Sequence, residues 1–136
     1  MSGELDTSLT ISASGLKAQS TRMRVIAENL ANADSTASEP GGDPYRRRVV
    51  DFRAELGRAD SVGVKVNGVE TDRSDFRRIH QPGHPAADAA GYVSMPNVNA
   101  LVEAADMKAA QRSYEANLNA IEAARAMLSR TVDLLR

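Results

Sequence analysis

The first hydrophobic pattern is a repeat of seven that runs through residues 5–32. Large apolar residues recur at this spacing, and small residues follow four positions after them. The large residues are Leu9, Leu16, Met23 and Leu30, and the small ones are Ala13, Ser20 and Ala27. Because residues three, four and seven apart share one face of a helix, the pattern predicts a long helix. Gly15 weakens this helix but allows a neighbouring element to approach closely.

A second repeat of seven occupies the last part of the chain, from 98 to 136, which contains no proline or glycine. Its large residues are Met107, Tyr114, Ile121, Leu128 and Leu135. Three positions after each of the first four lie Ala110, Asn117, Ala124 and Thr131. A period of 3.5 residues per turn is typical of helices that coil around one another. We therefore predict that the large residues of both helices form a seam, within the chain or between subunits.

The segment between the two helices, residues 37–97, contains all five prolines. "YRRRVVDFRAEL" (45–56) is compatible with a strand, and Val62, Val64 and Val66 alternate as in a half-buried strand. Asn67-Gly68 follows and predicts a hairpin turn. Residues 80–93 are rich in proline and glycine, so we expect them to be mostly irregular.

The predicted fold is mainly α with a small β insert: two long, antiparallel, coiled-coil-like terminal helices and a short β-containing middle segment. The predicted organisation is 1–36, 37–97 and 98–136. Two helices with an exposed outer face bury little area, so either part of the seam is reserved for neighbouring subunits, or the helical hairpin packs on its own β segment. The pattern alone leaves both arrangements open.

Composition excludes several classes of function. The net charge is −1, which argues against a dedicated nucleic-acid-binding protein. The absence of cysteine excludes disulfides and thiolate zinc sites. No stretch approaches the roughly 20 apolar residues of a membrane-spanning helix. The amino terminus lacks the basic and apolar regions of the usual secretory signal.

Candidate chemistry in the middle segment is sparse. His80, His84 and Asp88 are spaced for one helical face and a metal, but Pro82 and Pro85 disfavour a helix there. We therefore expect no metal site, no cofactor, no small-molecule substrate and no catalysis. The arginines at 46–48 are expected to form ion pairs with Asp51 and Glu55 or with a neighbouring subunit, rather than to bind phosphates.

Three motifs resemble the proximal rod proteins of the bacterial flagellar basal body, a branch of the flagellar rod and hook proteins. They are "NLANADST" (29–36), "GHPAADAAGYVSMPNVN" (83–99) and "RSYEANLNAIEAARAM" (112–127). The matching residues are Asn29, Leu30, Ala31, Asn32, Thr36, Gly83, His84, Pro85, Gly91, Tyr92, Pro96, Asn97, Tyr114 and Asn117. The Pro-Gly-Tyr that commonly follows the first motif is missing, and a longer loop leads to Pro44-Tyr45 instead.

The resemblance implies a structural protein that is exported by the flagellar type III apparatus. It would assemble helically with copies of itself and with other rod proteins, in the part of the drive shaft that crosses the periplasm. It also implies that the end of the first helix, near Asn29 and Asn32, contacts its own chain and adjacent subunits. The alternative is a cytoplasmic coiled-coil adaptor with no role in the motor.

Overall fold

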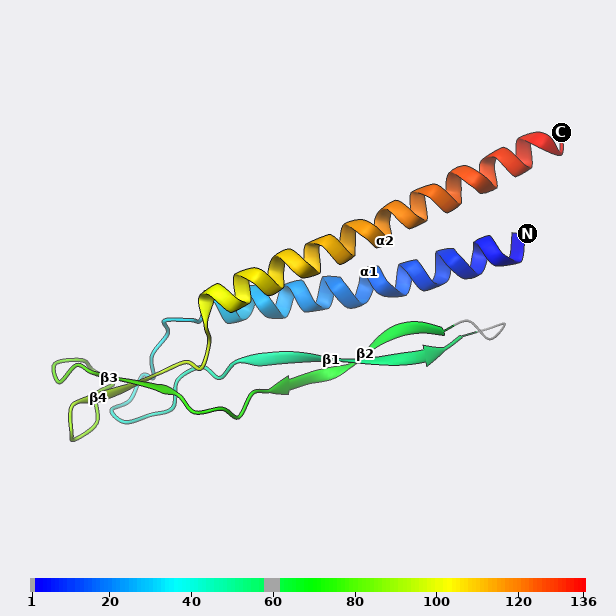
Figure 1. The fold of residues 1–136 in the computed structure, drawn as a ribbon. Coiled ribbons are helices and arrows are strands. Elements are labelled where there is room, and N and C mark those ends of the chain that lie inside the picture. The colour runs from blue at the N-terminus through cyan, green and yellow to red at the C-terminus, as the bar shows by residue number, and fades with distance from the viewer. Residues whose placement is uncertain (1, 58–61) are drawn as a thin grey trace. The chain divides into compact units, whose positions relative to one another are not determined.

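The structure is a computed structural model that describes residues 2–57 and 62–136. Figure 1 shows the elements in chain order, which is α1, β1, β2, β3, β4 and α2. The helices are α1 (Ser2–Ala31) and α2 (Ala100–Leu134), and they pack together in opposite directions. The predicted architecture, two long terminal helices with a small β insert, is therefore confirmed. Neither helix is long and apolar enough to cross a membrane.

The strands form two separate two-stranded sheets. In the first, β1 (Arg48–Leu56) pairs with β2 (Val62–Thr71). In the second, β3 (Arg77–His80) and β4 (Tyr92–Met95) are antiparallel, and Ile79 lies opposite Val93. Irregular structure was predicted for residues 80–93, and it is confirmed for residues 81–91. Residue 80 belongs to β3, and residues 92–93 belong to β4.

The predicted hairpin turn at Asn67-Gly68 is wrong, because β2 continues through both residues. Asn67 donates from Nδ2 to Asp51 Oδ2 on β1 at 2.7 Å, a bond between neighbouring strands that holds Asn67 in the ladder. Gly68 also lacks the positive φ that a tight hairpin turn requires; among the described glycines only Gly41 and Gly91 have it. A cross-strand partner therefore outweighed the local turn preference.

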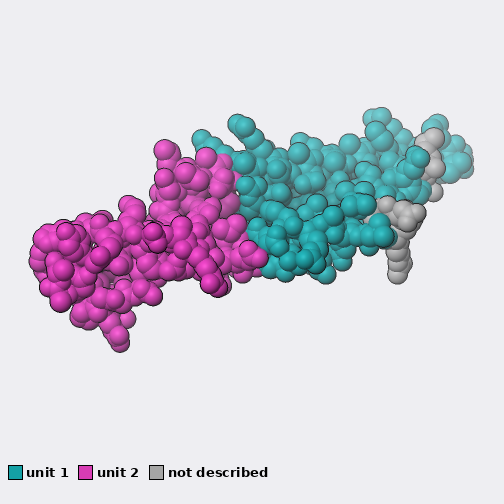
Figure 2. All heavy atoms as spheres, turned by 60° about the horizontal axis from the view of Figure 1, so that its bottom comes forward, with its two compact units in different colours: residues 1–23, 50–68, 108–136 teal, residues 24–49, 69–107 magenta. Residues whose placement is uncertain are grey.

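The chain divides into two compact units, which Figure 2 shows in different colours. Unit 1 comprises Met1–Met23, Val50–Gly68 and Lys108–Arg136, and unit 2 comprises Arg24–Val49 and Val69–Met107. The predicted segments 1–36, 37–97 and 98–136 are consecutive along the chain, whereas each compact unit combines parts of all three segments.

Small residues form the buried interior of unit 1. Its buried residues are Ser12, Ala18, Ala110 and Ala124. A Cβ on Gly15 would lie 2.7 Å from Nδ2 of Asn117, so α1 and α2 approach each other closely at this glycine, as the sequence predicted. None of the large apolar side chains described in unit 1 is buried.

The small-residue row predicted on α1, Ala13, Ser20 and Ala27, is exposed in the single chain, so any contact that it makes in a seam would be with another subunit. In this unit α1 contacts β2 as well as α2, because Ser14 Oγ accepts a hydrogen bond from the backbone N–H of Val64 on β2 at 3.1 Å. The second contact shifts the buried face toward Ser12 and Ala18. A repeat of seven assumes a single partner helix and could not reveal this shift.

Unit 2 contains the apolar core of the chain. Its buried apolar side chains are Val25, Ile26, Ala33, Ala86, Val93 and Val98. They come from the end of α1, the β3–β4 sheet with its connecting loop, and the residues just before α2. Val93 is fully buried, and Pro96 is among the largest fully buried residues. This core supports the polar side chains described next.

Candidate functional site: a polar junction in unit 2

The junction centres on Asn29, near the end of α1, whose side chain is only 1% exposed. Its Nδ2 donates to the backbone oxygen of Arg48 at 2.8 Å and to Oε2 of Glu103 at 3.2 Å. Its Oδ1 accepts from the Tyr45 hydroxyl at 2.7 Å and from the Arg48 N–H at 3.0 Å. Both donors and both acceptor positions of the amide are thus used. Asn29 joins α1, the start of β1 and α2.

Glu103 is the buried charge of the junction, in the first turn of α2 and also 1% exposed. Its Oε1 accepts a hydrogen bond from Nε of Arg47. Arg47 also lies 3.3 Å from Oδ2 of Asp72 and 3.7 Å from Oδ2 of Asp106. A buried carboxylate is tolerated only when it is paired and hydrogen-bonded, and Glu103 satisfies both conditions.

Asn97, from the second motif and just before α2, extends the network. Its Oδ1 accepts from the backbone N–H of Arg47 at 2.7 Å. Its Nδ2 donates to the backbone oxygens of Asp72 at 3.0 Å and of Ser74 at 3.2 Å. Asn29 and Asn97, two motif residues far apart in sequence, thus hold the same segment, Tyr45–Arg48.

Ionisation in the junction follows these contacts. Burial acts to lower the pKa of Arg47, but hydrogen bonds and charges from Glu103 and Asp72 outweigh it, so the pKa lies above its ordinary value. Hydrogen bonds from Ser74, and then Arg47, lower the pKa of Asp72. Burial raises the pKa of the Tyr45 hydroxyl. All three shifts stabilise the protonation states that the network requires at neutral pH.

Arg47 and Arg48 form ion pairs as expected, but not with the predicted partners, whereas Arg46 has no carboxylate partner in the described part of the chain. Arg47 pairs with the acidic groups named above, and Arg48 pairs with Glu28 of α1 at 3.4 Å. Asp51 and Glu55 instead contact Asn67 and Lys65 on β2. The partners lie more than 19 residues away along the chain, where sequence spacing gives no signal.

His80 ends β3, and His84 lies in the loop between β3 and β4. Nδ1 of His84 accepts the backbone N–H of Ala86 at 3.0 Å. The ring of His80 packs edge-on against Tyr92, with 4.9 Å between centroids. The tight turn beside them requires Gly91, which has a φ of 83° and lies where a Cβ would be 3.0 Å from Pro82. Within residues 2–57 and 62–136 no cluster of three His, Cys, Asp or Glu residues could hold a metal.

Asn32 closes the helix end. Its Nδ2 donates to the backbone oxygen of Glu28 at 2.8 Å, and its backbone oxygen accepts from the Ser35 hydroxyl at 3.0 Å. Since Asn29 has no hydrogen-bonding capacity left, the expected contact with a neighbouring subunit can involve only the half-buried Asn32. That contact remains a prediction.

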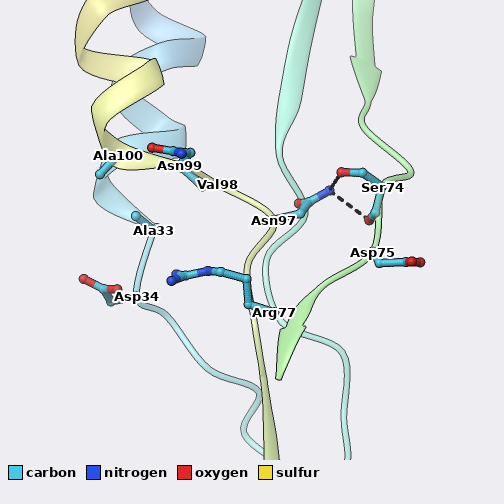
Figure 3. Close-up of a pocket in the computed structure, with 9 residues that line it drawn as sticks. All are labelled: Ala33, Asp34, Ser74, Asp75, Arg77, Asn97, Val98, Asn99 and Ala100. Atoms are coloured by element: carbon cyan, nitrogen blue, oxygen red, sulfur yellow. Dashed lines mark hydrogen bonds between the residues drawn. The ribbon is translucent and has the colours of Figure 1, made fainter. Parts of the chain in front are cut away.

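A hollow of about 460 Å³ opens beside the junction. Figure 3 shows Arg77 pointing toward Asp34, which follows the end of α1, while Asn99 lies above Arg77, at the start of α2. Asn99 caps α2 through hydrogen bonds from the backbone N–H groups of Leu101 and Val102 to its Oδ1. The lining offers scattered polar groups but no nucleophile with an adjacent base, so the hollow gives no indication of catalysis.

The other motif residues are dispersed. Leu30 and Ala31 end α1, and Thr36, Gly83 and Pro85 lie in exposed loops. Tyr114 and Asn117 lie in unit 1, where Asn117 donates to the backbone oxygen of Ser113 at 2.9 Å and contacts Gly15.

The predicted seam residues are not the most buried positions of the helices. Those half-buried are Leu9, Leu16, Met23, Leu30, Met107, Tyr114 and Ile121. Leu128 is 36% exposed, and Leu135 is 82% exposed and follows the end of α2. Their role as a subunit interface remains a prediction.

Sequence reasoning missed Glu103, although one signal was present. Glu103 lies seven residues before Ala110, in the row that continues through Asn117 and Ala124. A single acidic residue in an otherwise small and neutral buried row indicates a fixed partner. That partner, Arg47, lies 56 residues away and could not be identified from spacing.

Comparisons with known proteins agree with the resemblance seen in the motifs. Residues 9–37 match the family model described as flagella basal body rod protein, and residues 89–134 match the C-terminal model of the flagellar basal body rod FlgEFG proteins. Curated relatives named flagellar basal-body rod protein FlgC cover nearly the whole chain. The relative from Agrobacterium fabrum is 52% identical, over 93% of this chain and 91% of its own length.

More distant relatives carry the same name. The Salmonella typhimurium protein is 41% identical, over 91% of this chain and 92% of its own length. The Bacillus subtilis protein is 39% identical, over 93% of this chain and 95% of its own length. These similarities exclude the alternative functions of a cytoplasmic coiled-coil adaptor and of an enzyme. The chain belongs to the FlgC family of flagellar basal-body rod proteins, which are structural and have no enzymatic activity.

Proposed function

We propose that this chain, a structural subunit of the flagellar basal-body rod in the periplasmic space, assembles helically with copies of itself and with other rod proteins. In this role it forms part of the drive shaft that transmits torque. The resemblance to rod proteins also supports delivery by the flagellar type III export apparatus.

The observation that carries the proposal is the interior of unit 1. The residues buried there are small, whereas large apolar side chains of α2 remain exposed. Those exposed on α2 within unit 1 are Leu118, Met127, Leu128, Val132 and Leu134. Apolar residues on several sides of one helix indicate a helix that is covered in its final environment. Neighbouring rod subunits would provide that cover.

The proposal is tested with Leu128→Asp and the matched control Ser129→Asp. Both variants add one negative charge to an exposed position of α2, but only the first removes a large apolar side chain. Leu128 is 36% exposed, so covering the rest of it in an interface contributes about a third of the roughly 1.5–3 kcal/mol of a fully exposed leucine. An aspartate at this position adds a desolvation cost. We expect Leu128→Asp to abolish motility and the recovery of intact rods, and Ser129→Asp to preserve both.

Circular dichroism of the purified variants would confirm that each one folds. Normal motility of the Leu128→Asp strain, at the wild-type level of protein, would show that this surface is not covered during assembly.

A further inference from the structure

A second hollow of unit 2 is lined by two arginines and a threonine. It has a volume of about 420 Å³ and is formed by Arg46, Thr71 and Arg73. Among the residues that the structure describes, no carboxylate side chain contributes to this lining. The two guanidinium groups and the hydroxyl can bind a carboxylate, because an arginine side chain can donate two parallel hydrogen bonds to it.

Arg46 is held in position without any charge to neutralise it. Its Nη1 donates to the backbone oxygens of Asp72 at 3.3 Å and Ser74 at 3.1 Å. Its guanidinium lies 4.1 Å from the centroid of the Phe76 ring. These contacts fix the guanidinium before any ligand arrives, which lowers the entropic cost of binding.

Nearby arginines of unit 2 differ in this respect. Arg47, Arg48 and Arg78 each lie within ion-pair distance of a carboxylate. In the described part of the chain, neither Arg46 nor Arg73 has such a partner. The hollow therefore presents positive charge that is left over once the contacts within the subunit are made.

Unpaired negative charge occurs in the same unit, on the loop that precedes β1. Glu39 and Asp43 are exposed there, and neither forms an ion pair with any residue that the structure describes. The loop has a defined conformation, because Gly41 has a φ of 72° and donates its N–H to the backbone oxygen of Ala86 at 3.1 Å. One subunit thus carries both a donor-lined hollow and an acidic loop that do not pair with each other.

We propose that the hollow formed by Arg46, Thr71 and Arg73 binds the acidic loop of a second copy of this chain, through Glu39 or Asp43. The inference rests on the proposed assembly with further copies and names one contact within it. Two complementary surfaces at different places on one chain form a head-to-tail contact, and a contact of this kind generates an open helical assembly.

The experiment reverses charges on the two surfaces, in cells that produce only the variant chain. Arg73→Glu is compared with Arg77→Glu, which reverses an exposed arginine of the same unit that lines a different hollow. Arg73→Glu is then combined with Glu39→Arg and, separately, with Asp43→Arg. Assembly is measured as the yield of intact rods and as swimming motility.

We expect Arg73→Glu to lower the yield of rods by about tenfold, the effect of losing one close charge pair. Arg77→Glu should leave the yield unchanged, and one of the two acidic-loop substitutions should restore it. The proposal is overturned if Arg73→Glu behaves like Arg77→Glu, or if neither double variant recovers. If Leu128→Asp still blocks assembly in that case, the proposed function stands and only this contact is wrong.

Discussion

The Asn29→Asp substitution tests whether the polar junction stabilises unit 2. The new side chain has the same shape but no donors, so it loses the bonds to the Arg48 backbone oxygen and to Glu103. Those bonds contribute roughly 1 and 2 kcal/mol. An unpaired carboxylate beside the buried Glu103 costs several kcal/mol more, so we expect a total loss of about 4–6 kcal/mol at neutral pH. That is a large share of the roughly 5–15 kcal/mol by which domains are stable.

The pH dependence gives this prediction a distinct sign. Burial beside another carboxylate raises the pKa of the introduced acid above its value in the unfolded chain. A group whose pKa is raised on folding favours the folded state at low pH and loses that contribution as pH rises through the folded pKa. The stability deficit of Asn29→Asp relative to wild type should therefore shrink between pH 7 and pH 5.

The assay is urea unfolding followed by circular dichroism, at both pH values. Asn32→Asp is the matched control, because Asn32 is half-buried and donates only to the Glu28 backbone oxygen at 2.8 Å. We expect that control to lose about 1 kcal/mol. If both variants lose the same stability at pH 7, or if lowering the pH brings no recovery of Asn29→Asp, the account of the junction is wrong.

Two further predictions concern stability. Replacing Gly15 by alanine gains about 1 kcal/mol of helix propensity, but the new methyl group displaces the Asn117 amide. Thermal unfolding should therefore show increased stability only when Asn117 is also replaced by alanine. An equal increase in the wild-type background would contradict the close approach of the two helices. Hydrogen bonds from Ser74 lower the pKa of Asp72, so its contribution is present above the unfolded pKa of an aspartate and lost as pH falls through the folded pKa. Asp72→Asn should therefore reduce the acid sensitivity measured by urea unfolding, and an unchanged pH profile would refute this.

The helices were predictable because their signal is local and repeats many times. Each repeat of seven contains four or five large residues, and neither helix contains proline, so the expected spans are close to α1 and α2. The heptad pattern did not reveal how deeply each row is buried. The two helices approach each other closely where Gly15 faces Asn117, and the residues buried in unit 1 are small, so the large residues of the pattern are only half-buried or exposed.

The junction was predictable only in part. Asn29 and Asn97 were identified by their motifs, but neither the bonds that they make nor the role of Glu103 could be deduced. The contact between Arg47 and Glu103 joins positions 56 residues apart, and such pairing depends on the fold. The same limit explains the error at Asn67, where a bond to Asp51 on the adjacent strand keeps the residue in β2.

The central claim is that unit 1 is completed by neighbouring subunits. Hydrogen exchange, compared between the purified monomer and isolated rods, tests it most directly. Segments with few buried apolar contacts open readily, so residues 2–23 of α1 and 108–134 of α2 should exchange rapidly in the monomer and become protected in the rod. Equal and strong protection of both segments in the monomer would contradict the claim.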